Sequence, residues 1–328
     1  MKSIGIVGLP NIGKSTFFNV ITNQSVPAEN YPFCTIEKNS GVVEYKDEHL
    51  YKLSKVLESQ EVFYPLIQFV DIAGLVKGAS KGEGLGNQFL AHIREVDLIM
   101  YVLRAFPDKN VTHVEGSLNP TRDLDIILTE LILKDIESLE KKEQNLSKQA
   151  RNPNDKDAKI FLELVRQLKQ HLENEKTAYS FIKELDENKK QLINSLFLLT
   201  AKPAIFVLNV SYFDFMDNNY TQNLDKWQQE LKEYISQKYD DSTAEFITRL
   251  DAKFLLDSKN MNPTEIEEIK KELPFFADVN TIITLAKNKL NLINFYIGNK
   301  KDARSFFLEN GSTIVKAASY IHQDLADN

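Results

Sequence analysis

The sequence predicts an α/β protein in which helices wrap a largely parallel sheet. Short apolar stretches with β-branched residues have the length of buried strands. They occur at residues 2–7, 41–44, 66–70, 98–103 and 204–208. Helical segments separate most of them, an alternation that is typical of parallel sheets. The 328 residues are enough for two or three domains.

The composition narrows the class of protein. Hydrophobic residues make up 42% and charged residues 27% of the chain, which is typical of a globular protein and excludes a disordered one. No apolar run reaches the roughly 18 to 20 residues that a membrane helix needs, and we expect no membrane partner. The single cysteine, Cys34, fits a reducing cytoplasm. With a net charge of −7, any nucleic-acid contact must come from a local patch, and we expect no DNA partner.

Two long amphipathic helices are predicted in the middle of the chain. Apolar residues recur every three or four positions over residues 124–139 and 160–172, and a polar break at 151–155 separates the two stretches. This pattern predicts an antiparallel helical hairpin. If the first helix runs from residue 124 to 148, it reaches about 37 Å at 1.5 Å per residue. It would then project as an arm, although a helical subdomain with a solvated outer face fits the same pattern.

The predicted tip of this hairpin is basic. Residues 141–169 hold eight basic side chains against four acidic ones, inside a chain of net charge −7. The basic residues are Lys141, Lys142, Lys148, Arg151, Lys156, Lys159, Arg166 and Lys169. Such a tip suits contact with phosphate backbones, whereas charged helix faces also serve solubility alone.

A phosphate-binding motif follows the first predicted strand. Residues 8–15, GLPNIGKS, fit the pattern G-x-x-x-x-G-K-[ST] and lead into a predicted helix, as the motif requires. Gly8 and Gly13 let the backbone curl around a phosphate with its N–H groups inward. Lys14 is expected on the β and γ phosphates, and the Ser15 hydroxyl on Mg²⁺.

A second motif, DIAG at residues 71–74, ends the third predicted strand. In that place Asp71 is suited to reach Mg²⁺ through water, and the Gly74 N–H to face the γ-phosphate. Thr35 lies in a polar loop that would supply a second hydroxyl to the metal.

Several stretches together closely resemble the YchF/Obg-like ATPase family, from the translation-factor branch of the P-loop GTPases. They are residues 8–16, 31–37, 71–87, 113–116 and 202–203. The predicted hairpin also lies where this family has its inserted coiled-coil arm, and residues 317–324 resemble the start of its C-terminal TGS domain, a β-grasp.

The resemblance implies three units. A P-loop domain with a doubly wound sheet would comprise residues 1–120 and 199–277. The helical arm would comprise residues 121–198, and a partial TGS domain residues 278–328. The family's TGS domain runs further than this chain does.

The resemblance also implies a cytoplasmic, ribosome-associated, Mg²⁺-dependent ATPase. It would hydrolyse ATP to ADP and phosphate and act as a switch in translation or stress regulation. The implied nucleotide contacts are Asn11, Ile12, Gly13, Lys14, Ser15, Thr16, Gly74, Asn209 and Val210. The implied catalytic residues are Lys14 and His113, and the metal ligands are Ser15, Thr35 and Asp71. Asn11 would help to bind K⁺ near the bridge between the β and γ phosphates.

The segment that normally reads guanine is altered. Related GTPases use N-K-x-D, in which the aspartate accepts from the ring N–H and the exocyclic amine of guanine. Here residues 209–212 read NVSY, so Tyr212 replaces the acid and also departs from the N-x-x-E of the resembling family. We therefore expect ATP to bind more tightly than GTP. Asp214 would replace the acid only if the loop rearranged.

The group that orients the attacking water is also missing from its usual place. Related GTPases have a glutamine directly after D-x-x-G, and this chain has Leu75. The resemblance points to His113 instead. Two alternatives to an ATPase remain: a true GTPase with a non-standard base reader, and a scaffold that binds nucleotide and hydrolyses little of it.

Overall fold

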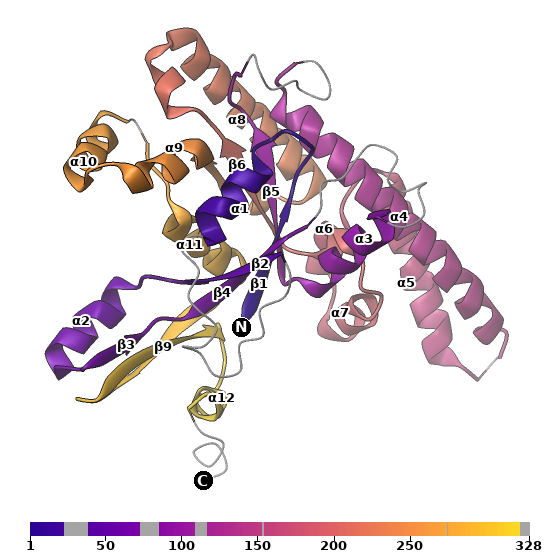
Figure 1. Cartoon of the computed structure of the whole chain (residues 1–328). Coiled ribbons are helices and arrows are strands. Elements are labelled where there is room, and N and C mark those ends of the chain that lie inside the picture. The colour runs from indigo at the N-terminus through magenta and orange to yellow at the C-terminus, as the bar shows by residue number, and fades with distance from the viewer. Residues whose placement is uncertain (23–38, 73–84, 109–116, 153, 274, 322–328) are drawn as a thin grey trace.

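The predicted α/β fold is confirmed by a computed structural model, which describes residues 1–22, 39–72, 85–108, 117–152, 154–273 and 275–321. A six-stranded sheet has the order β2-β4-β1-β5-β6-β7, and only β2 runs antiparallel to its neighbour (Figure 1). The strands are β1 (Lys2–Val7), β2 (Ser40–Glu44), β4 (Leu66–Asp71), β5 (Leu98–Arg104), β6 (Ala204–Asn209) and β7 (Ile247–Leu250).

The central strands of this sheet lie in the hydrophobic core. Every residue of β5 and β6 is buried, because helices cover both faces of a parallel sheet. Helices around the sheet bury apolar side chains in the same core as these strands. They include α1 (Lys14–Thr22), α4 (Pro120–Gln149), α8 (Asn218–Lys238) and α11 (Val279–Lys289).

The strand register brings several loops to one edge of the sheet. Ile6 of β1 pairs with Asp71 of β4, and Asn209 of β6 pairs with both Arg104 of β5 and Leu250 of β7. The loops that follow these parallel strands therefore open side by side at their carboxyl ends. Ligands bind at this edge in open α/β sheets.

The helical hairpin is inserted between β5 and β6. It consists of α4 and α5 (Lys156–Glu173), which extend away from the sheet (Figure 1). The helix α4 has 30 residues, about 45 Å at 1.5 Å per residue. It begins earlier than predicted because the Asn119 side chain caps it and Pro120 occupies its first turn. Asp155 caps α5 in the same way.

The helix α4 belongs to two cores at once. Its first turns pack in the core of the sheet, and its later turns pack against α5. The first group is Leu124, Ile127, Leu128 and Leu131, and the second is Ile132, Leu139 and Leu146. The arm is thus fixed to the sheet by a continuous helix, and the division of the chain into domains stays a prediction.

A smaller sheet combines strands from distant parts of the chain. It has the order β3-β9-β8, formed by β3 (Glu61–Phe63), β9 (Asp302–Glu309) and β8 (Leu292–Gly298). The strand β3 runs parallel to β9. Asp47 caps α2 (Glu48–Leu57) and also accepts hydrogen bonds from Asn294 and, at 2.6 Å, from the Tyr296 hydroxyl. That β8 and β9 are part of a TGS domain stays a prediction.

Shorter helices complete the described chain. They are α3 (Leu85–Glu95), α6 (Ala178–Lys183), α7 (Glu187–Asn194), α9 (Ala252–Asp257), α10 (Pro263–Glu272) and α12 (Ile314–Ser319), with 3-10 turns at residues 199–201, 212–216, 243–245 and 258–260. Within the part of the chain that the structure describes, no helix is both long and apolar enough to cross a membrane.

Asp135 of α4 links the arm to the segment by which the chain returns to the sheet. Its buried carboxylate accepts hydrogen bonds from the main-chain N–H groups of Leu199 and Thr200, both at 2.8 Å, and from the Thr200 hydroxyl at 2.7 Å. These residues lead directly from the arm to β6. Burial raises the pKa of Asp135 to about 6.

This pKa predicts how stability depends on pH. The folded carboxyl binds its proton more tightly than an unfolded one, whose pKa is 3.8. Its contribution to the free energy of unfolding therefore falls as the pH rises from about 4 to about 6. In urea unfolding, we expect the stability of the wild type relative to Asp135→Asn to fall by roughly 2 to 3 kcal/mol over that range.

A matched control is Asp186→Asn, at the exposed start of α7, where hydrogen bonds from Lys189 lower the pKa of the carboxyl. That control should show no such fall. A wild-type advantage over Asp135→Asn that is constant from pH 4 to 6 would contradict the raised pKa.

Candidate nucleotide-binding site

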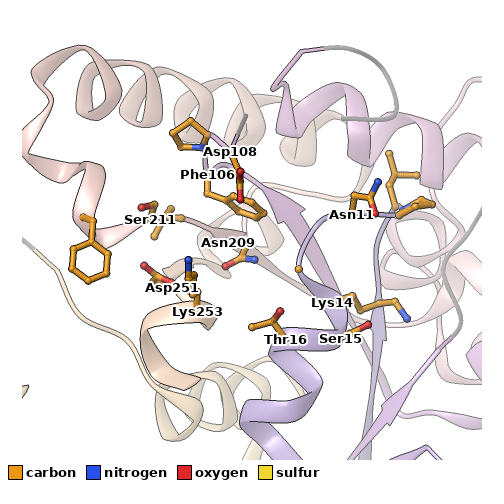
Figure 2. Close-up of a pocket in the computed structure, with 16 residues that line it drawn as sticks. Asn11, Lys14, Ser15, Thr16, Phe106, Asp108, Asn209, Ser211, Asp251 and Lys253 are labelled. Carbon is orange, nitrogen blue, oxygen red and sulfur yellow. The ribbon is translucent and has the colours of Figure 1, made fainter. Parts of the chain in front are cut away.

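A cavity of about 700 Å³ opens at the carboxyl edge of the large sheet (Figure 2). Four segments line it: the loop after β1 with the first turn of α1, the loop after β5, the end of β6 with the residues that follow, and the start of α9. Its volume lies within the range of small-molecule sites. Asn11, Lys14, Ser15 and Thr16, all predicted nucleotide contacts, lie along one part of its wall.

The loop after β1 needs its glycine at position 13. Gly13 has a φ of +84°, a left-handed conformation that side chains rarely adopt. A Cβ atom there would also collide with the Asn209 side-chain nitrogen. Asn11 also has a positive φ, +64°, which asparagine tolerates better than most residues. Both residues line the cavity.

Lys14 links this loop to the end of β4. Its ammonium lies 2.5 Å from a carboxylate oxygen of Asp71 and donates to the Ile72 carbonyl at 2.9 Å. Ser15 follows Lys14 at the start of α1 and lines the cavity. A hydroxyl and a carboxylate are oxygen ligands of the kind that Mg²⁺ prefers, so the chemistry of Ser15 and Asp71 fits that ion. Thr35, Gly74, Leu75 and His113 lie outside the described residues.

The Asn209 side chain bridges the phosphate loop and the start of α9. Its side-chain nitrogen donates to the Ile12 carbonyl at 2.8 Å, and its side-chain oxygen accepts from the Ala252 N–H at 3.2 Å. Ile12 contributes main chain here, because its side chain is buried in the core. Val210 lines the cavity, and its N–H donates to the Leu250 carbonyl at 3.0 Å.

Arg104, at the end of β5, organises the loop that follows. It is 2% exposed, and it donates to the carbonyls of Phe106 at 3.2 Å, Asp108 at 3.3 Å and Asn11 at 3.5 Å. Its guanidinium also lies 4.5 Å from the centre of the Phe106 ring. Burial lowers the pKa of Arg104. This residue was not predicted from the sequence. The sequence shows only a charged residue at the end of an apolar strand.

Known proteins match the whole of this architecture. A family model described as "50S ribosome-binding GTPase" matches residues 3–130. The protein named "Ribosome-binding ATPase YchF" of Bacillus subtilis is 39% identical, over 98% of this chain and 84% of its own length. The chain belongs to the YchF family. A YchF protein of Escherichia coli O157:H7 is 38% identical over the same shares.

A solved structure supports the assignment. The structure of the Schizosaccharomyces pombe YchF GTPase superposes with a TM-score of 0.82 and 36% identity. The match covers 99% of this chain and 85% of that one. The predicted YchF resemblance and the P-loop fold are therefore confirmed.

In this YchF-family chain, Tyr212 faces away from the cavity. Its ring centre lies 5.4 Å from that of Phe254, 5.8 Å from Phe215 and 6.1 Å from Phe276. Its hydroxyl accepts from the Ala277 N–H at 3.3 Å, and burial raises its pKa to about 12. This position therefore serves packing and does not line the cavity. Asp214 does not line it either.

The start of α9 supplies polar groups to which the sequence assigned no role. Asp251 and Lys253 line the cavity together with Ser211 and Phe213. Asp251 is buried, and burial raises the pKa of its carboxyl. An aspartate directly before a helix was a recognisable signal for a cap. The family resemblance placed a base-contacting loop near residues 246–252, but it assigned no specific contact to Asp251.

The contacts of Arg104 predict that it shapes the nucleotide pocket. Lysine keeps the positive charge but cannot make the three divergent hydrogen bonds. Losing one or two net hydrogen bonds of a charged group should weaken nucleotide binding roughly tenfold to 100-fold. Calorimetric titration of Arg104→Lys with ATP checks this, with exposed Arg94→Lys as the matched control. Unchanged affinity in Arg104→Lys would contradict the role.

Proposed function

We propose that this YchF-family protein is a Mg²⁺-dependent ATPase that associates with ribosomes in the cytoplasm and acts as a nucleotide-dependent switch. The observation that carries the proposal is the contact between Lys14 and Asp71, at 2.5 Å, beside a cavity formed by a phosphate-loop motif. The names of the bacterial relatives, which describe ribosome-binding ATPases, support it.

The residues at the phosphate end of the cavity, which is the end formed by the phosphate loop, have separate tasks in this proposal. The loop amides and Lys14 bind the β and γ phosphates and stabilise the charge that spreads over them during transfer. Ser15 and Asp71 would hold Mg²⁺, with Thr35 as a further ligand. When bound, Mg²⁺ neutralises phosphate charge. Gly74 would donate its N–H to the γ-phosphate, and His113 would orient the attacking water.

The proposed preference for ATP over GTP rests on the base end of the cavity, which is the end away from Lys14. Guanine recognition in related proteins needs an acid where this chain has Tyr212, and Tyr212 is held in an aromatic cluster. The competing function is that of a GTPase, as the S. pombe relative is named. Calorimetric titration with ATP and GTP separates the two, and tighter GTP binding would favour the GTPase.

We also propose that K⁺ assists hydrolysis through Asn11. This residue lines the cavity at the phosphate loop. A monovalent cation held there would add positive charge near the transferred phosphoryl group.

Turnover measurements test the ATPase proposal. Lys14→Met should lower ATP hydrolysis at least 100-fold, because the charge on the transferred phosphate loses its ammonium partner. Lys52→Met, on the exposed face of α2, is the matched control and should keep the wild-type rate. Chelation of Mg²⁺ should stop the reaction, and replacement of K⁺ by Na⁺ should slow it.

Either of two results would contradict the ATPase proposal. Nucleotide binding without turnover, even with ribosomes present, would mean a scaffold. Faster turnover of GTP than of ATP would mean a GTPase.

We propose that the arm tip contacts ribosomal RNA. Near the base of the tip, Arg166 donates to Glu143 at 2.9 Å and Lys169 lies 3.5 Å from the same carboxylate. Around the turn between α4 and α5, Lys148, Arg151 and Lys156 are exposed. The turn is therefore where the arm offers positive charge to phosphates.

Charge reversal tests the arm. The triple variant Lys148→Glu, Arg151→Glu, Lys156→Glu should co-sediment with ribosomes at least tenfold less strongly, since each lost phosphate contact weakens binding. Lys271→Glu, Lys300→Glu, Lys301→Glu changes the net charge equally at exposed positions outside the arm and is the matched control. Equal loss in both variants would mean that net charge, and not the tip, governs binding.

A further inference from the structure

The base end of the cavity retains a carboxylate although the usual acid is absent. Figure 2 shows Asp251 beside Ser211 and Lys253, at the end of the cavity away from Lys14. Asp251 comes from the start of α9, a different loop from the one that carries Tyr212. A side chain at this end faces the part of a nucleotide that lies farthest from its phosphates.

The carboxylate of Asp251 is held in a fixed orientation. One oxygen accepts from the Tyr212 N–H at 2.7 Å, and the other accepts from the Phe254 N–H at 2.8 Å. The residue is 3% exposed and still lines the cavity. The Lys253 N–H is a third backbone donor to the same carboxylate. A carboxylate has about four acceptor positions, so these bonds still leave one for a ligand.

Asp251 is also tied to the phosphate end. Its neighbour Ala252 donates to the side-chain oxygen of Asn209 at 3.2 Å, and the nitrogen of the same side chain donates to Ile12 at 2.8 Å. One buried amide thus sets the spacing between the phosphate loop and the start of α9. A nucleotide whose phosphates occupy the loop meets Asp251 at a fixed place.

We propose that Asp251 reads the base of the bound nucleotide by accepting a hydrogen bond from the exocyclic amine of a purine. It takes over the role of the acid that Tyr212 replaces. This inference rests on the proposed function and deepens it, because adenine carries its amine at C6. A purine without that amine loses the hydrogen bond to a buried carboxylate and leaves its remaining acceptor position empty, which weakens binding.

The test compares ATP with purine riboside triphosphate, which lacks the C6 amine, by calorimetric titration. We expect the wild type to bind ATP about tenfold to 100-fold more tightly than the analogue. In Asp251→Ser, the affinity for ATP should drop to that for the analogue, whereas the affinity for the analogue should stay within about twofold. Serine still caps a helix, which preserves α9.

Two further variants separate base reading from a structural role. Asp217→Ser makes the same change at the cap of α8, outside the cavity lining, and should leave the ratio of ATP to analogue unchanged. Asp251→Asn keeps the shape of the side chain and should lower the ratio if Asp251→Ser does not fold.

Three outcomes decide the inference. Equal wild-type affinity for ATP and the analogue would overturn it. Equal weakening of both ligands in Asp251→Ser would also overturn it, because Asp251 would then only position the loop. Tighter GTP than ATP binding would overturn the proposed function instead. In that case the same comparison, made with GTP and inosine triphosphate, which lacks the amine, would support the inference if Asp251→Ser removed the difference.

Discussion

The side chain of Asn209 is the constraint on which the candidate site depends. It lies at the carboxyl end of a wholly buried strand, and its amide joins the phosphate loop to the start of α9. An amide can satisfy a carbonyl and an N–H at the same time, which a hydroxyl or a carboxylate in this place cannot do as well. A buried polar group without partners is costly. The end of β6, the phosphate loop and the start of α9 therefore keep one relative arrangement. The left-handed Gly13 leaves room for this amide.

Around this amide, the sheet does the positioning. The strand register brings Asp71, Arg104 and Asn209 to one edge of the sheet, although these residues are far apart in the sequence. Arg104 and Asn209 end neighbouring strands, and Asp71 ends β4 on the other side of β1. Arg104 fixes the loop after β5 by donating hydrogen bonds to its carbonyl groups. The phosphate end and the base end are therefore parts of one rigid edge of the sheet, not of independent loops.

Part of this was open to prediction from sequence. The phosphate loop could be recognised because a phosphate imposes glycines, a lysine and a hydroxyl at fixed spacings. Five of the six strands of the large sheet could be recognised because they are short apolar stretches. The strand β7 was not predicted, because it has four residues and only every second one is buried. Arg104 and Asp251 could not be assigned, since their roles come from contacts across strands and loops. Tyr212 shows the same limit: the sequence revealed a missing acid, and only the packing revealed an aromatic cluster. The pairing of β3 with β9 left no local signal either.

That last pairing has a consequence for how the chain acquires its shape. The strands β3 and β9 are about 240 residues apart, and β3 lies on an excursion between two strands of the large sheet. At about 5 to 20 residues per second of synthesis, β3 waits roughly 12 to 48 s for its partner to leave the ribosome. During that time, the nascent chain exposes an open strand edge, which favours aggregation. The smaller sheet can therefore close only after nearly all of the described chain has been synthesised.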